Sequence, residues 1–372
     1  MTPRRILIAT QTFPPDLGGM ERLMGDMAVS ALEQGHRVEV FADRIRSGLP
    51  EFTAPGLRLE RFGGPRPLRR ILKRRAIARA LREGPPAIVI ADSWKSVEAL
   101  PPNTGPLLVL AHGTELPPEP SARKAARIRA AMARATAIAA NSRYTQRVVA
   151  GFVDPGDAAM VGVVCPPIRP QGTAGAADRA AVAALVGTQG PVILTLARLE
   201  PRKGVDQVIR ALPALAARHP GIVHLVAGPG DDRPRLEALA AKLGVAARVR
   251  FLGPITDDGM RAALYGAADL LAMPARRQGA SVESFGIVYL EAAWHGVPAL
   301  AGREGGEADA VLDGETGLLC DGADPGAVAA ALATLLADPD RLQTMGAQAA
   351  ARVRAEFLWP AVLPRYLNLL EP

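Results

Sequence analysis

The stretch Pro191-Val-Ile-Leu-Thr-Leu-Ala-Arg-Leu-Glu-Pro-Arg-Lys-Gly-Val-Asp206 decides the fold of this chain. Its first seven residues are almost all apolar, which is typical of a strand buried on both faces of a parallel sheet. A polar loop that contains Pro201 and Gly204 follows at once, and a helical pattern comes after the loop. Because this strand-loop-helix pattern recurs along the chain, it predicts an α/β protein with doubly wound parallel sheets.

The apolar runs fall into two groups. The first comprises Arg4–Thr10, Arg37–Phe41, Ala87–Ala91, Leu107–Ala111, Thr136–Ala140 and Met160–Val164, and the second comprises Pro191–Ala197, Ile222–Ala227, Arg248–Leu252, Asp269–Met273 and Val297–Ala301. The intervening segments, such as Met20–Gln34 and Ser121–Arg134, have helical length and spacing. Between the groups, Cys165–Gly175 holds three prolines and two glycines and is typical of a linker.

These patterns predict two Rossmann-like domains, residues 1–168 and 169–355, that face a central cleft. In open α/β sheets, ligands bind beyond the carboxyl ends of the strands, so we expect the ligand there. The chain has 372 residues, of which 49% are hydrophobic and 22% charged, which excludes intrinsic disorder and suits two domains.

Cysteine content and hydropathy indicate the compartment. Cys165 and Cys320 are too few for a disulfide scaffold or a metal cluster, and they fit a reducing cytoplasm. No apolar run approaches the roughly 18 residues that span a bilayer. The N-terminus, Arg4 and Arg5 followed by Ile6–Ala9, is too short for a signal peptide. We therefore expect a soluble cytoplasmic protein.

The net charge of +7 is unevenly distributed. Residues 1–165 carry 24 Lys and Arg against 15 Asp and Glu, a net of +9, whereas the remainder carries 20 against 22, a net of −2. A basic first half indicates an anionic partner, which is a nucleic acid, a membrane surface or a phosphorylated substrate. Nucleic acid is disfavoured because aromatic residues for base stacking are nearly absent from the basic stretches.

Residues 66–82 hold eight basic residues in 17 and form a predicted basic amphipathic helix. Its apolar residues recur at roughly helical spacing: Leu68, Ile71, Leu72 and Ile77. We expect this apolar stripe to pack on the sheet. Contact of the basic residues with anionic lipid at the inner face of the membrane stays an open alternative to simple solvation.

Two loops carry residues suited to phosphate. In Phe13–Glu21, the adjacent Gly18 and Gly19 allow backbone amides to approach an anion at a helix N-terminus, although an ordinary turn has the same composition. After Ala197, Arg198 and Lys203 would emerge at the carboxyl end of a strand, where they can hold both phosphates of a diphosphate. The alternative for this second loop is a solvated basic turn.

Glu283 and Glu291 lie eight positions apart around a predicted helix start. If the helix begins at Phe285, the span is about 12 Å, comparable to the distance from a sugar ring across a phosphate to a ribose. Carboxylates accept two hydrogen bonds from adjacent hydroxyl groups. The amides of Gly286 and Ile287 would face the diphosphate. A helix cap with one surface glutamate is the alternative.

In their order and spacing, these segments resemble the family 4 retaining glycosyltransferases, which have the GT-B fold. The resemblance extends over nearly the whole chain and includes His112-Gly113, Asn141-Ser142, Ala227–Gly230, Phe251–Gly253, Gly305-Gly306 and Asp313–Gly317. The stretch Met273–Glu283 is most similar to bacterial mannosyltransferases of the phosphatidylinositol mannosyltransferase type. The Asn-Gly-Val-Asp segment of many relatives is replaced here by Val164–Arg169.

The resemblance implies a metal-independent hexosyltransferase without a cofactor. It would move a mannose- or glucose-type hexose from a GDP- or UDP-sugar to a glycan or lipid-linked acceptor in cell-envelope polysaccharide or glycolipid biosynthesis. A GT-B sugar-nucleotide epimerase, a phosphorylase and a non-catalytic nucleotide-binding scaffold are the alternatives. A dehydrogenase is disfavoured because no Gly-x-Gly-x-x-Gly follows any predicted strand. Asp338-Pro339-Asp340 is the only Asp-x-Asp, and it is typical of a turn and helix cap.

The resemblance also implies roles for single residues. Arg198 and Lys203 would hold the donor diphosphate, Glu283 the hydroxyls of the transferred sugar, and Glu291 the ribose. Gly18 and Gly19 would close over the phosphates. His112, at the end of its strand, would lie near the sugar. The C-terminal helix, residues 356–372, would pack back on the first domain.

Overall fold

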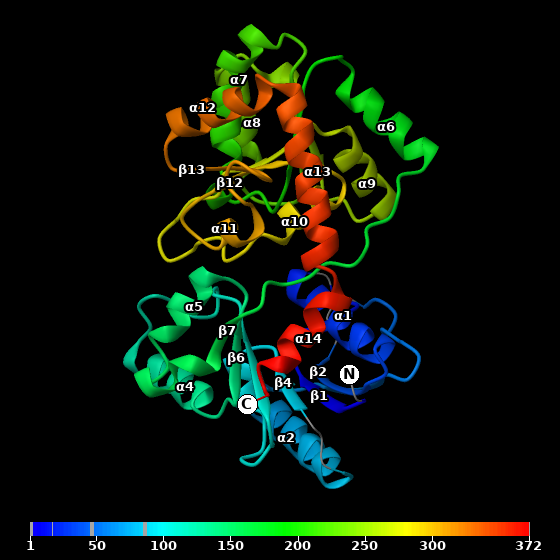
Figure 1. Cartoon of the computed structure of the whole chain (residues 1–372), viewed down its shortest axis with the longest axis vertical. Helices are drawn as coiled ribbons and strands as arrows, with labels where there is room; N and C mark the ends of the chain where they lie inside the picture. Colours follow the sequence, from blue (N-terminus) through cyan, green and yellow to red (C-terminus); the bar gives the residue numbers. More distant parts are fainter. Residues whose placement is uncertain (1–2, 17, 45–47, 85–87, 372) are drawn as a thin grey trace. The chain divides into compact units, whose positions relative to one another are not determined.

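The computed structural model describes residues 3–16, 18–44, 48–84 and 88–371. The chain divides into two compact units (Figure 1). Unit 1 comprises Met1–Arg169 with Leu358–Pro372, and unit 2 comprises Pro170–Phe357. Each unit contains one sheet whose paired strands are all parallel, with connecting helices. The predicted fold class of two Rossmann-like doubly wound domains is confirmed.

The sheet of unit 1 has the strand order β3-β2-β1-β4-β5-β6-β7. Its strands are β1 (Arg5–Ala9), β2 (Arg37–Asp43), β3 (Arg58–Phe62), β4 (Ile88–Ala91), β5 (Leu107–Ala111), β6 (Ala137–Ala140) and β7 (Val161–Val163). The prediction lacks β3, because this strand at the sheet edge alternates charged and apolar residues and is mostly half-buried. Ala87 and Leu17, which fall within predicted segments, lie outside the described residues.

Alternate side chains of the central strands of unit 1 build two cores. Ile6 and Ile8 of β1 belong to the core that includes α1 (Gly19–Glu33) and α14 (Trp359–Asn368). Leu7 and Ala9 belong to the other core, which includes α2 (Arg66–Arg82), α3 (Trp94–Val97), α4 (Ala122–Met132) and α5 (Arg143–Ala150). The last helix therefore completes unit 1, and Figure 1 shows it beside α1.

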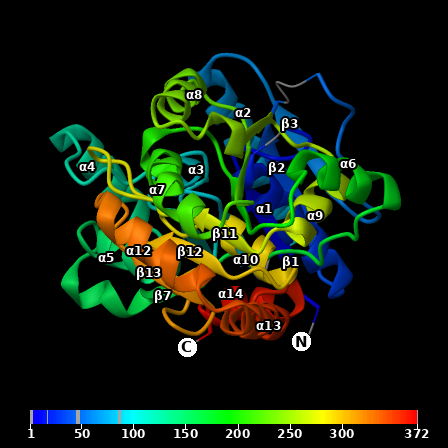
Figure 2. The same ribbon diagram turned by 90° about the horizontal axis from the view of Figure 1, so that it is seen from above.

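The sheet of unit 2 has the order β10-β9-β8-β11-β12-β13. Its strands are β8 (Val192–Leu196), β9 (Val223–Ala227), β10 (Val249–Gly253), β11 (Leu270–Met273), β12 (Ala299–Gly302) and β13 (Gly317–Cys320). The prediction lacks only β13, a short edge strand. The helices are α6 (Ala176–Val186), α7 (Val205–Arg218), α8 (Arg233–Lys242), α9 (Asp258–Ala267), α10 (Ile287–Trp294), α11 (Glu307–Ala310), α12 (Pro325–Leu336) and α13 (Pro339–Glu356). Figure 2 shows α7 and α12 side by side.

The basic helix α2 forms over the predicted residues, but its apolar stripe is oriented differently. Ile77 is buried, whereas Leu68, Ile71 and Leu72 are 50%, 49% and 40% exposed, so the expectation that the whole stripe packs on the sheet is wrong. Lys73 shares the buried face instead, because its Nζ donates to the Thr10 carbonyl oxygen (2.7 Å) and to the Asp43 carboxylate (2.6 Å). Within the described ranges, no helix is long and apolar enough to cross a membrane.

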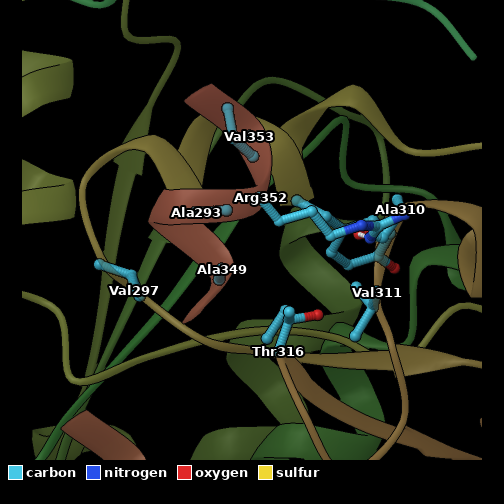
Figure 3. Close-up of a pocket in the computed structure, with 10 residues that line it drawn as sticks. Ala293, Val297, Ala310, Val311, Thr316, Ala349, Arg352 and Val353 are labelled. Atoms are coloured by element: carbon cyan, nitrogen blue, oxygen red, sulfur yellow. Dashed lines mark hydrogen bonds between the residues drawn. The ribbon is translucent and has the colours of Figure 1, made fainter. Parts of the chain in front are cut away.

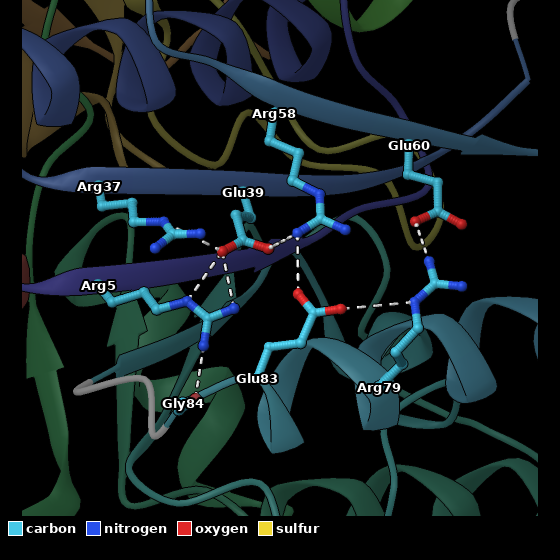
Figure 4. A network of polar contacts seen from close by, with 8 residues as sticks. All are labelled: Arg5, Arg37, Glu39, Arg58, Glu60, Arg79, Glu83 and Gly84. Atoms are coloured by element: carbon cyan, nitrogen blue, oxygen red, sulfur yellow. Dashed lines mark hydrogen bonds and ion pairs between the residues drawn. The ribbon is translucent and has the colours of Figure 1, made fainter.

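A buried carboxylate fixes the amino ends of the first three strands. Glu39 of β2 is almost fully buried (Figure 4). It lies among three arginines, which are Arg5 of β1, Arg37 of β2 and Arg58 of β3. The closest pair joins Arg5 Nη2 to Glu39 Oε1 at 2.7 Å. Because ligands of doubly wound sheets bind at the opposite, carboxyl edge, this network has a structural role and consumes part of the basic charge of unit 1.

Replacing Glu39 tests this role. We expect Glu39→Gln to lower the free energy of unfolding by about 3 kcal/mol, because it leaves Arg5, a mostly buried cation, without its carboxylate. Urea denaturation of the two proteins measures the difference. The matched control is Glu60→Gln, which removes a more exposed pair with Arg79 and should cost less than about 1 kcal/mol. Equal losses for both variants would contradict a special role for Glu39.

Candidate functional site

The strand order of unit 2 locates its ligand-binding edge. β8 pairs with β9 on one side and with β11 on the other. From β8 the chain adds β9 and β10 in one direction, and from β11 it adds β12 and β13 in the opposite direction, so the switch point lies between β8 and β11. The loops that follow β8 and β11 (residues 197–204 and 274–286) therefore start side by side at the switch point of the sheet. This is the position at which open α/β sheets bind ligands.

Charged residues from these two loops meet at the switch point. Glu283, in the loop after β11, accepts a hydrogen bond from Arg202 Nη1 at 2.9 Å and forms an ion pair with Lys203 Nζ. Arg202 Nε also donates to Glu200 (2.8 Å), which forms a 3.0 Å ion pair with Arg198. We call these five residues the cation cluster. The structure thus brings Lys203 and Glu283 together, as neighbours that the sequence places 80 positions apart.

The members of the cation cluster differ in how far their side chains are exposed to solvent. The side chains of Arg202, Lys203 and Glu283 are only 11–12% exposed, whereas that of Arg198 is 69% exposed. Arg202 therefore occupies the buried position beside Glu283, and the sequence prediction, which names Arg198 and Lys203, misses it. The available signal was the adjacency of Arg202 to Lys203 in a short turn, because neighbouring residues of a tight turn can approach the same partner.

Opposing effects act on the carboxyl group of Glu283. Its burial alone would raise the pKa, but the charges and hydrogen bonds of Lys203 and Arg202 outweigh burial and hold the pKa of Glu283 below its ordinary value. Glu283 is therefore ionised at neutral pH. The cation cluster contains three cations and two carboxylates, so one positive charge is in surplus for an anionic ligand.

Backbone geometry holds the two loops together. The turn Pro201–Lys203 ends at Gly204, whose φ of +74° directs the chain into α7. A Cβ at Gly204 would overlap the carbonyl oxygen of Pro274, so the loops touch at a point where only glycine fits. In addition, the Arg276 N–H donates to the Arg202 carbonyl oxygen (2.8 Å). The position of the cation cluster is therefore set by main-chain contacts as well as by charge.

The second predicted carboxylate, Glu291, lies on α10. This helix begins at Ile287, two residues later than expected, because Gly286 adopts a φ of +87° in front of it. Glu291 is largely buried, and its Oε2 accepts a hydrogen bond from the Tyr265 hydroxyl (3.1 Å). The assignments of Glu291 to a ribose and of the Gly286 and Ile287 amides to a diphosphate stay predictions.

Unit 1 has its own switch point, between β1 and β4. Asp92, which follows β4, accepts hydrogen bonds from Thr10 Oγ1 (2.7 Å) and the Gln11 N–H (2.9 Å), and the sequence prediction misses it. His112 follows β5, and its ring Nε2 lies 3.1 Å from the Asp92 carbonyl oxygen. A carbonyl oxygen only accepts, so Nε2 carries the proton. The proximity of His112 to a sugar stays a prediction.

The two predicted phosphate-binding glycines begin α1. Gly18 is the N-cap of this helix, and both Gly18 and Gly19 are exposed. A Cβ at Gly18 would overlap the carboxylate of Glu21, whereas Gly19 has open space around it. Burial raises the pKa of Glu21, and the nearby carboxylates add to this shift. The closure of Gly18 and Gly19 over phosphates stays a prediction.

A metal centre and an enclosed cavity are two other kinds of feature that bind small ligands in proteins. In the part of the chain that the structure describes, no three His, Cys, Asp or Glu side chains form a group suited to a metal ion. Asp338 caps α13 by accepting from the Arg341 N–H (3.0 Å), which confirms the predicted turn and cap. A cavity between α10 and α13 (Figure 3) has a volume of about 10 Å³ and therefore admits one water molecule at most.

Solved structures share this fold. The glycosyltransferase from Rickettsia africae matches with a TM-score of 0.78 and 17% identity, over 100% of this chain and 98% of that one. The Anabaena protein HepE in complex with UDP matches with a TM-score of 0.78 and 21% identity, over 98% and 99% of the two chains. The fold is therefore the GT-B fold of glycosyltransferases.

Sequence comparisons match each half of the chain to a family of glycosyltransferases. Residues 17–169 match the family described as Glycosyltransferase Family 4, and residues 181–352 match Glycosyl transferases group 1. Each family model covers most of one unit, which is consistent with a family 4 glycosyltransferase of the GT-B fold. One relative is the GDP-mannose-dependent alpha-(1-6)-phosphatidylinositol monomannoside mannosyltransferase of Mycolicibacterium smegmatis, which is 47% identical over 158 residues, 42% of this chain. The match spans 41% of the length of that relative.

Two glycines test the contact between the loops of the site. Gly204→Ala should lower the free energy of unfolding by about 3 kcal/mol, because it combines an unfavourable positive φ with overlap of Pro274. Gly244, with a φ of +70° and open space around it, is the matched control. Gly244→Ala should cost only about 1 kcal/mol. Thermal or urea unfolding measures both variants, and indistinguishable losses would disprove the close contact.

Proposed function

We propose that this chain is a retaining, metal-independent hexosyltransferase. Its donor is a nucleoside-diphosphate hexose of the mannose or glucose type, with GDP-mannose favoured by the relative named above and UDP-sugars as the alternative. Its acceptor is a glycan or a lipid-linked glycan in the biosynthesis of cell-envelope polysaccharide or glycolipid. The cation cluster at the switch point of unit 2 is the observation that carries this proposal.

The proposed roles follow from the contacts in the ligand-free site. A diphosphate carries two or more negative charges, and Lys203 and Arg202 are cations held close together by Glu283. Arg198 adds an exposed guanidinium, paired with Glu200, that can form a bidentate contact with phosphate. We assign the donor diphosphate to these three side chains. Glu283 then accepts hydrogen bonds from hydroxyls of the transferred sugar with the oxygen that its cations leave available.

The transfer reaction requires few chemical groups from the protein. The acceptor hydroxyl oxygen bonds to the anomeric carbon on the face from which the diphosphate departs, and the hydroxyl proton passes to the departing phosphate oxygen. Retention of configuration follows because bond making and breaking occur on the same face. Lys203 and Arg202 stabilise the negative charge that develops on the leaving diphosphate, a contribution that preorganised charges supply efficiently. These cations thereby substitute for a divalent metal ion.

Replacing Lys203 tests this function. Lys203→Ala should lower hexose transfer by about 10³-fold, because it removes a charge that stabilises the leaving group. Product formation from GDP-mannose, UDP-glucose and ADP-glucose with a panel of glycolipid acceptors measures turnover. Lys242→Ala, which removes an exposed lysine of α8 in the same unit, is the control and should retain full activity.

Other outcomes of this assay separate the alternatives. Near-normal turnover of Lys203→Ala would refute the role of Lys203. Nucleotide binding, seen as a thermal shift, without turnover of any donor would indicate a scaffold, and interconversion of donor sugars without an acceptor would indicate an epimerase. Phosphorolysis of a glycan by inorganic phosphate would indicate a phosphorylase. A donor screen with no thermal shift at all would overturn the nucleotide-sugar proposal.

We place the protein in the cytoplasm, with peripheral contact to an anionic membrane through α2. One face of this helix presents the exposed residues Leu68, Ile71 and Leu72. At helical spacing, the same face continues with the exposed Arg75, Arg79 and Arg82. Apolar side chains followed by cations on a single helical face suit the acyl boundary and the headgroups of an anionic bilayer. A lipid-linked acceptor would reside in the same membrane.

Vesicle binding tests the proposed membrane contact. Arg75→Gln with Arg82→Gln should weaken binding to phosphatidylserine-containing vesicles about 30-fold, because each cation near the surface is worth about 1 kcal/mol. Co-sedimentation measures the binding, and neutral phosphatidylcholine vesicles should bind neither protein. Leu68→Ser should also weaken binding, whereas Leu49→Ser, at an exposed leucine outside α2, should not. Equal binding of all variants would exclude α2 as the contact.

A further inference from the structure

Glu307, the first residue of α11, is a fully buried carboxyl group to which the proposed reaction assigns no role. Neither of its carboxyl oxygens forms a hydrogen bond of good geometry. The nearby backbone N–H groups of Gly305 and of Glu307 itself stabilise its charged form only in part. A buried carboxylate without a cationic partner is unfavourable, so such a group favours its neutral, protonated form.

Glu307 lies directly behind the loop that carries Glu283. Its Oε2 is so close to Gly305 that a Cβ there would approach it within 2.6 Å, and Oε1 is similarly close to Gly302. Gly306, which directly precedes Glu307, donates its N–H to the Glu283 carbonyl oxygen at 2.9 Å. The carboxyl group of Glu307 is therefore packed against the backbone that supports the cation cluster.

Two neutral and two charged side chains interact electrostatically with Glu307. Tyr289 and Cys320 stay neutral near pH 7, because burial raises the pKa of Tyr289 well above its ordinary value and that of Cys320 to about 12. Glu283 is negative and Lys203 is positive, but these two already pair with each other. Burial, reinforced by the charge of Glu283, raises the pKa of Glu307 to about 7.

The protonation state of Glu307 determines the charge at the site. With Glu307 neutral, the cation cluster retains its surplus of one positive charge. With Glu307 ionised, a third carboxylate faces the cluster and cancels that surplus. We propose that Glu307 is a further functional residue of the donor site, whose neutral carboxyl group is required for tight binding of a nucleoside diphosphate because it leaves the surplus positive charge of the cation cluster uncancelled. This inference rests on the proposed function, since it concerns the same diphosphate.

The proposal predicts a specific pH dependence. Affinity for a nucleoside diphosphate should fall about tenfold as the pH rises from 6 to 8.5, because ionisation of Glu307 opposes the incoming anion. Glu307→Gln mimics the neutral carboxyl group at every pH. It should bind as tightly as the unmodified protein at pH 6 and should not lose affinity as the pH rises.

Calorimetric titration of the full chain with GDP and with UDP tests this prediction. The two proteins are compared at each pH with Glu315→Gln, which neutralises an exposed carboxylate of the same unit and should follow the unmodified protein. Titration of the ligand phosphate is common to all three proteins and cancels in the ratio of their affinities. Parallel pH profiles of the unmodified protein and Glu307→Gln would overturn the inference.

Unfolding experiments read Glu307 without any nucleotide. A pKa raised from its ordinary value of 4.5 in the folded chain means that stability is greatest below about pH 4.5, declines as the pH rises to about 7 and then levels off. In Glu307→Gln, the free energy of unfolding should decline less over this pH range, because the titration of Glu307 no longer contributes. An unchanged decline would contradict the claim that Glu307 is neutral in the folded chain at low pH. If neither nucleotide binds any of the three proteins, the proposed function fails together with this inference. Tight binding with parallel pH profiles refutes only the inference.

Discussion

The ion pairs of Glu283 with Lys203 and Arg202 are the constraint on which the site depends. They join the loops that follow two neighbouring strands, β8 and β11. A largely buried carboxylate that loses its cations is strongly unfavourable, so neither loop can shift without the other. The same contact collects positive charge at the switch point of the sheet. One interaction therefore stabilises the loops and prepares them for an anionic ligand.

The sequence predicts every strand except β3 and β13, each of which forms one edge of its sheet, and this failure has a physical reason. Central parallel strands are buried on both faces and appear as continuous apolar runs. The edge strand Arg58–Phe62 is partly exposed and mixes charged with apolar residues, so no such run marks it. The face of α2 is misassigned for a related reason. Periodicity identifies the apolar stripe of the helix but not which face is buried. Lys73 is buried because it pairs with Asp43, which is 30 positions away in the sequence.

The site is predicted in outline, because Lys203 and Glu283 follow strands that meet at the switch point. The identity of the second buried cation is not, because Arg198 and Arg202 lie in the same loop and only the folded turn decides which of them reaches Glu283. Asp92 and Glu307 escape prediction for another reason. These two carboxylates stand out by their burial and by the residues around them, and the residue type alone predicts neither property.

Position on the sheet, rather than the kind of ion pair, separates structural from functional charge in this chain. Glu39 and Glu283 are both buried carboxylates paired with more than one cation. Glu39 lies among the amino ends of its strands, where its arginines are used to hold the sheet together. Glu283 lies beyond the carboxyl end of β11, the edge at which open α/β sheets bind ligands. The excess of basic residues in the first half therefore overstates the charge available for binding, since Glu39, Asp43 and Glu98 neutralise part of it within the fold. The cations of the cation cluster, by contrast, belong to the half of the chain with a net negative charge.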